Sequence, residues 1–92
     1  MTMPDLEALT SADFQPLRGE RFRVADAFDA ELVEVTEIER EPGGRAPFSL
    51  VFEGGPAPPL PQGIYAVRHD DLGAIEIFLV PIAAGRYEAV FT

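Results

Sequence analysis

The sequence predicts a mainly β fold, a small antiparallel barrel or sandwich of about six strands with one short N-terminal helix. Two observations lead to this prediction. From Glu20 onward, apolar and polar residues alternate with a period of two in short segments, which is typical of half-buried strands. Glycine, proline and aspartate separate these segments at short intervals, as expected for turns between antiparallel strands.

The chain length predicts one domain, 1–92, with the short helix in an N-terminal segment (1–19) followed by a β core (20–92). Hydrophobic residues make up 47% of the chain and include seven phenylalanines, which is enough for a packed core. The sequence contains no cysteine, so disulfide bonds, thiolate zinc sites and cysteine nucleophiles are excluded.

The helix is predicted to begin at Thr10, because Thr10 and Asp13 have the spacing of a capping box. Pro16 limits it to one or two turns, and Gly19 ends it. We expect its apolar side chains and those just before it to form a lid over one end of the β structure. These residues are Leu6, Leu9, Phe14 and Leu17.

Three strands are expected in the first part of the β core. Phe22–Val24 is followed by a long segment, Phe28–Glu39, which is rich in β-branched and acidic residues. The apolar residues of this segment change parity, which predicts a bulge near Glu37. A turn at Pro42–Gly44 then leads to the strand Phe48–Phe52.

The proline-rich stretch Gly54–Pro61 interrupts regular structure. We interpret it as a stiff connector between strands, because it is short and has no basic residues beside it. The alternative is a polyproline ligand for an aromatic groove on another protein.

The rest of the chain is predicted to be a three-strand meander of Ile64–His69, Ile75–Ile82 and Tyr87–Phe91. In its first hairpin, a three-residue loop with Gly73 in the left-handed conformation would place Arg68 opposite Glu76. The middle strand is apolar on both faces, so we expect it to be central and either to close a barrel or to be covered outside. The last strand is expected to offer an edge for pairing with a partner.

Sixteen acidic residues oppose seven basic ones, and the net charge is −9. This charge disfavours binding to nucleic acid and to anionic membrane surfaces. We interpret the acidity as a solubility feature, with a basic partner as the alternative. The apolar run Ile77–Ala84 is too short to insert in a membrane, and Met1–Thr10 does not resemble a signal peptide. We therefore expect a protein that is cytoplasmic at synthesis.

The segment His69-Asp70-Asp71 is the one cluster that suggests chemistry. A histidine beside carboxylates can bind a metal ion or act as a general base, and Ser49 would complete a serine triad. However, a transition-metal site needs three or four converging ligands, and aspartates in a hairpin loop bind the amides of that loop. The acidic run from Asp26 to Glu41 lacks a calcium-loop pattern. The sequence therefore predicts no catalytic, cofactor-binding or metal-binding residues, and no enzyme.

Several stretches are similar to an uncharacterised family of short, single-domain bacterial proteins, which is loosely associated with phage-tail collar-like genes. These stretches are Leu6–Phe14, Pro47–Phe52, Leu60–Tyr65, Ile77–Ile82 and Tyr87–Phe91. The resemblance implies a structural or accessory role in a tail-like or surface assembly, and with it a place in an assembled or exported particle. It implies no catalytic residues.

Three functional hypotheses follow from these observations. The preferred one is a non-enzymatic structural or protein-interaction module that self-associates or docks on a larger protein. The second is a small-ligand-binding module with an apolar pocket lined by five aromatic rings, those of Phe48, Phe52, Tyr65, Phe78 and Phe91. The third is a hydrolase that uses His69 with Asp70 or Asp71.

Overall fold

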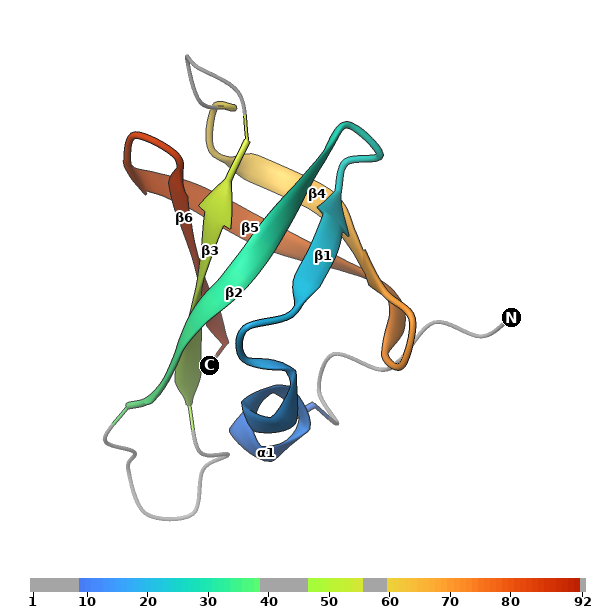
Figure 1. Ribbon diagram of the computed structural model, residues 1–92. Coiled ribbons are helices and arrows are strands. Elements are labelled where there is room, and N and C mark those ends of the chain that lie inside the picture. Colours follow the sequence, from blue (N-terminus) through green and yellow to red (C-terminus); the bar gives the residue numbers. More distant parts are fainter. Residues whose placement is uncertain (1–8, 39–46, 56–59, 92) are drawn as a thin grey trace.

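The computed structural model of the protein describes residues 9–38, 47–55 and 60–91. Six antiparallel strands form a closed barrel (Figure 1). The strands are β1 (Arg21–Val24), β2 (Phe28–Glu37), β3 (Phe48–Gly54), β4 (Gly63–His69), β5 (Gly73–Ala83) and β6 (Arg86–Phe91). The prediction of a small antiparallel β fold is confirmed, and of the two predicted architectures the barrel is the one that forms.

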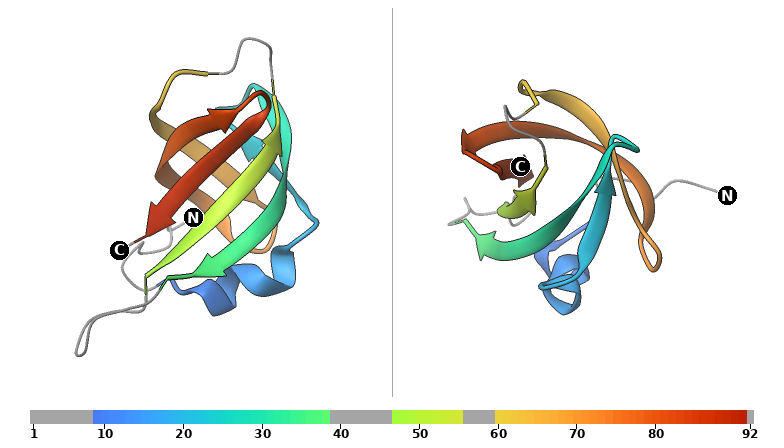
Figure 2. Two further views of the ribbon diagram at one scale, coloured as in Figure 1. Left: turned by 90° about the vertical axis from the view of Figure 1, so that its left-hand side faces the viewer. Right: turned by 45° about the horizontal axis from the view of Figure 1, so that its top comes forward.

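Around the barrel the strands follow the order β1-β2-β3-β6-β5-β4, and β4 closes the ring by pairing with β1. The chain therefore forms two meanders, β1–β3 and β4–β6. One junction between them is the long pairing of β3 with β6, and Figure 2 shows β2, β3 and β6 side by side along this wall. The other junction, which we call the β1–β4 seam, sets Arg23 opposite Arg68 and Val24 opposite Val67.

The interior of the barrel is filled by side chains that face inward at every second strand position, as the predicted period requires. Phe22 on β1 packs edge-on against Phe52 on β3, with ring centroids 5.3 Å apart. Phe48 and Phe91 stack with centroids 4.6 Å apart. Other core residues come from β2 to β6 and include Leu32, Leu50, Val67, Ile75, Ile77, Leu79, Tyr87 and Ala89.

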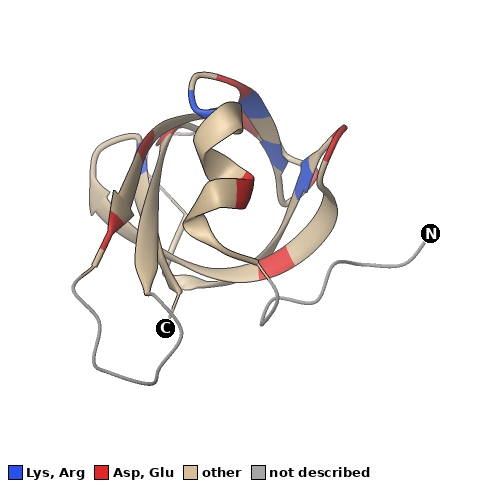
Figure 3. Ribbon diagram, turned by 90° about the horizontal axis from the view of Figure 1, so that it is seen from below, with Lys and Arg blue, Asp and Glu red and all other residues tan. Residues whose placement is uncertain are grey.

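A helical segment lies across one end of the barrel (Figure 3). It consists of α1 (Ser11–Phe14) and a 3₁₀ turn at Gln15–Leu17. The backbone N–H of Thr10 donates to the Asp13 carboxylate at 2.8 Å, which confirms the predicted start. Phe14 is buried with its ring 5.7 Å from that of Phe48 and 5.7 Å from that of Phe91. No helix within the described residues is long and apolar enough to cross a membrane.

The predicted lid is thus present, with Leu9, Phe14 and Leu17 buried. Leu6 lies outside the described residues, as do the predicted turn Pro42–Gly44 and residues 56–59 of the proline-rich connector.

The bulge predicted near Glu37 is wrong, because it lies instead at Val33. Leu32 pairs with Phe52, and Glu34 pairs with Val51, so one extra residue is accommodated between them. The prediction assumed that Ile38 faces the core, whereas its side chain is exposed. The change of parity is needed earlier, between the inward-facing Leu32 and Val35.

The register predicted for the β4–β5 hairpin is also wrong by two residues. Gly73 does adopt a positive φ of 86°, but it pairs with His69, so that Ala74 lies opposite Arg68 and Glu76 lies opposite Ala66. The prediction relied on attraction between Arg68 and Glu76. The register is set instead by the tight Asp70–Leu72 loop, and Arg68 finds its acidic partner on another turn, at Asp26.

The β1–β2 turn is strained. Ala25 and Asp26 have φ values of 53° and 52°, in the left-handed region that favours glycine. The turn is closed by a 2.9 Å hydrogen bond from Ala27 N–H to Val24 C=O. It is also tied to β4 by a 2.7 Å hydrogen bond from Ala25 N–H to Ala66 C=O, so contacts outside the turn maintain this conformation.

Replacing Ala25 with glycine is expected to raise the free energy of unfolding by about 0.5–1 kcal/mol. The reason is that removing the strain of a left-handed alanine stabilises the folded state more than the extra conformational entropy of glycine stabilises the unfolded chain. Ala66→Gly, within β4, is the matched control and should lower it by about 0.5–1 kcal/mol. Equilibrium urea denaturation measures both. Similar losses for the two variants would show that the Ala25 turn carries no strain.

Candidate functional site

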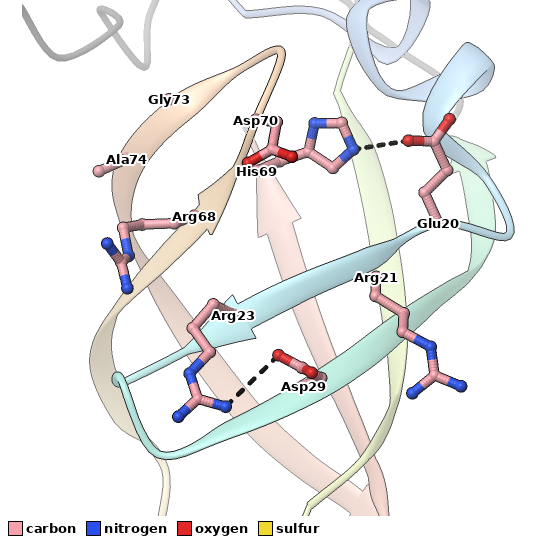
Figure 4. Close-up of a pocket in the computed structure, with 9 residues that line it drawn as sticks. All are labelled: Glu20, Arg21, Arg23, Asp29, Arg68, His69, Asp70, Gly73 and Ala74. Atoms are coloured by element: carbon pink, nitrogen blue, oxygen red, sulfur yellow. Dashed lines mark hydrogen bonds and ion pairs between the residues drawn. The ribbon is translucent and has the colours of Figure 1, made fainter.

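A polar hollow of about 640 Å³ lies at the β1–β4 seam (Figure 4). Its lining is formed by Glu20, Arg21, Arg23, Asp29, Arg68, His69, Asp70, Gly73 and Ala74. The Arg68 guanidinium binds the carboxylate of Asp26, and that of Arg23 lies 3.4 Å from the carboxylate of Asp29. Because the seam places Arg23 opposite Arg68, these ion pairs offset a repulsion between like charges.

His69 lies at the end of β4, with its side chain only 6% exposed and its ring 4.8 Å from that of Phe22. Nε2 lies 2.7 Å from Oε1 of Glu20. Nδ1 accepts a 3.0 Å hydrogen bond from the backbone N–H of Asp71. A nitrogen that accepts a hydrogen bond carries no proton, so the proton of the neutral ring lies on Nε2 and is donated to Glu20.

These hydrogen bonds limit the chemistry of the cluster that the sequence singled out. Glu20, His69 and Asp71 offer ligand atoms within 4.8 Å of one another. A metal ion or a proton to be abstracted needs a free lone pair on a ring nitrogen. Here the Nδ1 lone pair faces an N–H group and Nε2 carries the proton, so binding or base catalysis would first have to break the Asp71 hydrogen bond. The cluster as arranged ties the β4–β5 turn to the start of β1.

Glu20 was not predicted as a partner of His69. The two residues are 49 positions apart in the sequence, and no local pattern connects them. They meet because the seam brings the beginning of β1 beside the end of β4. Asp70, in contrast, lies at the turn where the sequence places it.

The other candidate groups do not converge on His69. Ser49 is buried on β3, which pairs with β2 and β6, whereas His69 lies on β4. The residues of the acidic run that the structure describes follow the β1–β2 turn and β2, and within the described residues they supply no group of three close potential metal ligands.

The five rings of the predicted apolar pocket do not surround one cavity. Phe48, Phe52 and Phe91 are packed in the core, and Tyr65 is partly buried against it. Phe78 points outward and is 49% exposed. Phe78 and Phe91 are the two that line a common groove. The prediction of a shared pocket is wrong because alternate residues of a strand lie on opposite sides of the barrel wall.

An apolar surface covers the outside of the β4–β6 meander. Ile64 and Phe78 face each other across β4 and β5 and are 67% and 49% exposed. Val90 on β6 is 54% exposed, and Ile82 further along β5 is 49% exposed. We call this surface the apolar face and define it as Ile64, Phe78, Val80, Ile82 and Val90. The sequence predicts the apolar outer side of β5 but not its extension over β4 and β6.

A groove divides the apolar face where β5 and β6 separate. The two strands pair at Val80–Glu88, Pro81–Tyr87 and Ala83–Arg86, with a register shift after Pro81. On the N-terminal side of Val80, a hollow of about 230 Å³ lies between the two strands, which we call the β5–β6 groove. It is lined by Ile64, Glu76, Ile77, Phe78, Ala89, Val90 and Phe91. The last strand is not the outer edge of an open sheet, because β3 pairs with its whole length on one side and β5 pairs with Arg86, Tyr87 and Glu88 on the other.

Carboxylates border the apolar face. Glu76 lies two residues before Phe78 and Glu88 two residues before Val90, so each shares the outer side of its strand with an apolar neighbour. Neither carboxylate forms an ion pair with any residue that the structure describes. Arg86, two residues before Glu88, lies 3.3 Å from the carboxylate of Glu53.

The neutral ring of His69 is expected to carry its proton on Nε2, because Asp71 N–H occupies Nδ1. Long-range proton–nitrogen correlation spectra of the uniformly labelled protein distinguish the two tautomers. His69 is the sole histidine, so its signals need no assignment by mutagenesis. A spectrum with the proton on Nδ1 would contradict the arrangement and would leave Nε2 free for a ligand.

Two phenylalanines on opposite sides of the wall should respond differently to truncation. Phe48→Ala removes a fully buried ring and is expected to lower the free energy of unfolding by about 3–5 kcal/mol. Phe78→Ala removes a half-exposed ring and should lower it by less than about 1 kcal/mol. Thermal and urea denaturation measure both changes. Equal losses would show that Phe78 is covered in the folded protein.

Comparisons with known proteins place the chain in a family. No curated protein and no solved structure matches it significantly. A family model described as a domain of unknown function, DUF6916, matches residues 9–91, which include the helical lid and all six strands. The chain therefore belongs to the DUF6916 family.

Proposed function

We propose that the protein is a non-enzymatic interaction module that docks on another protein through its apolar face. The observation that carries this proposal is the exposure of Ile64, Phe78 and Val90, which are neighbours on three adjacent strands. Exposed apolar side chains are common singly, but a continuous group on one sheet face marks an interaction surface. Aromatic residues in particular are enriched at protein–protein interfaces.

The shape of the hollows favours a protein partner over a small ligand. Pockets for small molecules span roughly 300–1,000 Å³ and are mostly apolar. The β5–β6 groove is apolar but holds about 230 Å³. The seam hollow is larger, but ion pairs and hydrogen bonds with neighbouring side chains already engage Arg23, Arg68 and His69. Neither hollow matches both requirements of a small-molecule site.

The chemistry of His69 supports a non-enzymatic role. Both ring nitrogens are engaged, one by Glu20 and one by the Asp71 amide, and the ring is nearly buried. A hydrolase would need this histidine to accept a proton from water or from a nucleophile. The same hydrogen bonds have a structural role, because they connect the β4–β5 turn to the start of β1.

The wider role that we propose is that of a subunit or accessory of a multiprotein assembly in bacteria. The resemblance of the sequence to proteins associated with phage-tail collar-like genes supports a tail-like particle as that assembly. The net charge of −9 argues against nucleic acid and anionic membranes as partners. Self-association through the apolar face is the alternative form of the same function.

Site-specific photo-crosslinking in cells that naturally make the protein tests the proposal. A photoreactive phenylalanine analogue at the position of Phe78 should yield a protein adduct of defined mass. The same analogue at Glu31, which is exposed on β2 across the barrel, should not. The adduct must be identified by mass spectrometry and must be reduced at least about 10-fold by Val90→Asp, because a charge there disrupts an apolar contact. Equal labelling at both positions, or none at Phe78, would refute the proposal.

A further inference from the structure

We propose that the β5–β6 groove binds an extended, basic segment of a partner protein, which inserts one apolar side chain between the strands and places lysines or arginines on Glu76 and Glu88. This inference rests on the proposed function and names the chemistry of its partner. Three features of the groove carry it, namely its apolar lining, the strand edge beside it and the charges at its border.

The lining of the groove is suited to an apolar anchor. Ile77, Ala89 and Phe91 are core residues whose side chains face inward, and they are reached where the two strands separate. Phe78 and Val90 are half-exposed and form the outer walls. A volume of about 230 Å³ is small for a drug-sized ligand, so it fits a side chain better than a separate molecule.

The main chain beside the groove favours an extended segment. One edge of β5 pairs with β4 along its whole first part, from Gly73 opposite His69 to Leu79 opposite Gly63. On the N-terminal side of Val80, the other edge of β5 has no partner among the residues of β6 that the structure describes. A strand laid along this edge gains main-chain hydrogen bonds, and its alternate side chains reach the groove.

The charges at the border select a basic segment. Glu76 lines the groove itself, and Glu88 lies beside Val80 at the point where the ladder stops. Both carboxylates lack an ion-pair partner among the described residues, in contrast to Asp26, Asp29 and Glu53, which all contact arginines. In an extended segment paired with this edge, the residues next to the inward-pointing anchor point to the outer side, so basic residues there meet the outward-facing carboxylates.

A second copy of this chain is a poorer occupant of the groove. In a dimer with a two-fold axis, both subunits use the same surface, so the acidic border of one copy would lie close to the acidic border of the other. Each copy also carries a net charge of −9, which opposes association. A basic partner gains from the same charges.

Selection from a displayed library of random nine-residue peptides on the immobilised full-length protein tests the inference. Enriched peptides should have a large aliphatic or aromatic residue with Lys or Arg directly next to it on one or both sides. A synthetic enriched peptide should bind the double variant E76K/E88K about 10-fold more weakly, as expected for two exposed ion pairs. The matched control E31K/D70K changes the net charge equally but leaves the groove lining intact, and it should bind within about twofold of the unmodified protein.

The outcomes separate this inference from the proposed function. Enriched peptides without basic residues, whose binding is still lost in Phe78→Ala, would refute the basic segment but leave docking on the apolar face in place. A dimer in sedimentation that Phe78→Ala dissociates would assign the groove to a second copy. No enrichment, together with no crosslinking at Phe78, would overturn both proposals. Selection of acidic flanking residues by E76K/E88K would add independent support.

Discussion

Closure of the barrel at the β1–β4 seam is the constraint on which the rest of the structure depends. The register there sets Arg23 opposite Arg68 and Val24 opposite Val67, so the main-chain ladder is short and places two like charges face to face. Side chains around the seam compensate for this. Arg68 binds Asp26, and His69 shares a hydrogen bond with Glu20. The polar side chains that line the hollow therefore also join the two meanders.

The strained β1–β2 turn follows from the same constraint. Ala25 N–H reaches Ala66 C=O across the seam, and the Arg23 side chain donates to the backbone carbonyl of Asp26 at 3.2 Å. The first contact extends the seam by one main-chain hydrogen bond, and the second lies within the β1–β2 turn. They require a turn with two consecutive positive φ values, which glycine would adopt with less strain than alanine.

The apolar face has no comparable explanation within the folded chain. The barrel interior is filled by inward-facing residues, so the outward Phe78 adds little to the core. An exposed apolar sheet face also favours aggregation, and proteins commonly counter this with nearby charges. Glu76 and Glu88 can serve in this way while the face is free. In the complex that we propose, the same two carboxylates attract the basic residues of the partner.

The sequence by itself determined the local elements of this protein. The period of two located all six strands, and the Thr10–Asp13 spacing located the short helix, because both depend on neighbouring residues. It also indicated that β5 is apolar on both sides. The bulge and the β4–β5 register were misplaced, since they depend on which side chains face the core and on how tightly a loop closes.

Only the tertiary structure decided how these elements make surfaces. The contact of Glu20 with His69, the separation of β5 from β6 and the grouping of Ile64 with Phe78 and Val90 all join residues that are distant in the sequence or lie on different strands. Such contacts depend on strand order and on the path of each strand around the barrel. The physical reason is that alternation tells which side of a strand a residue occupies but not which other strand lies beside it.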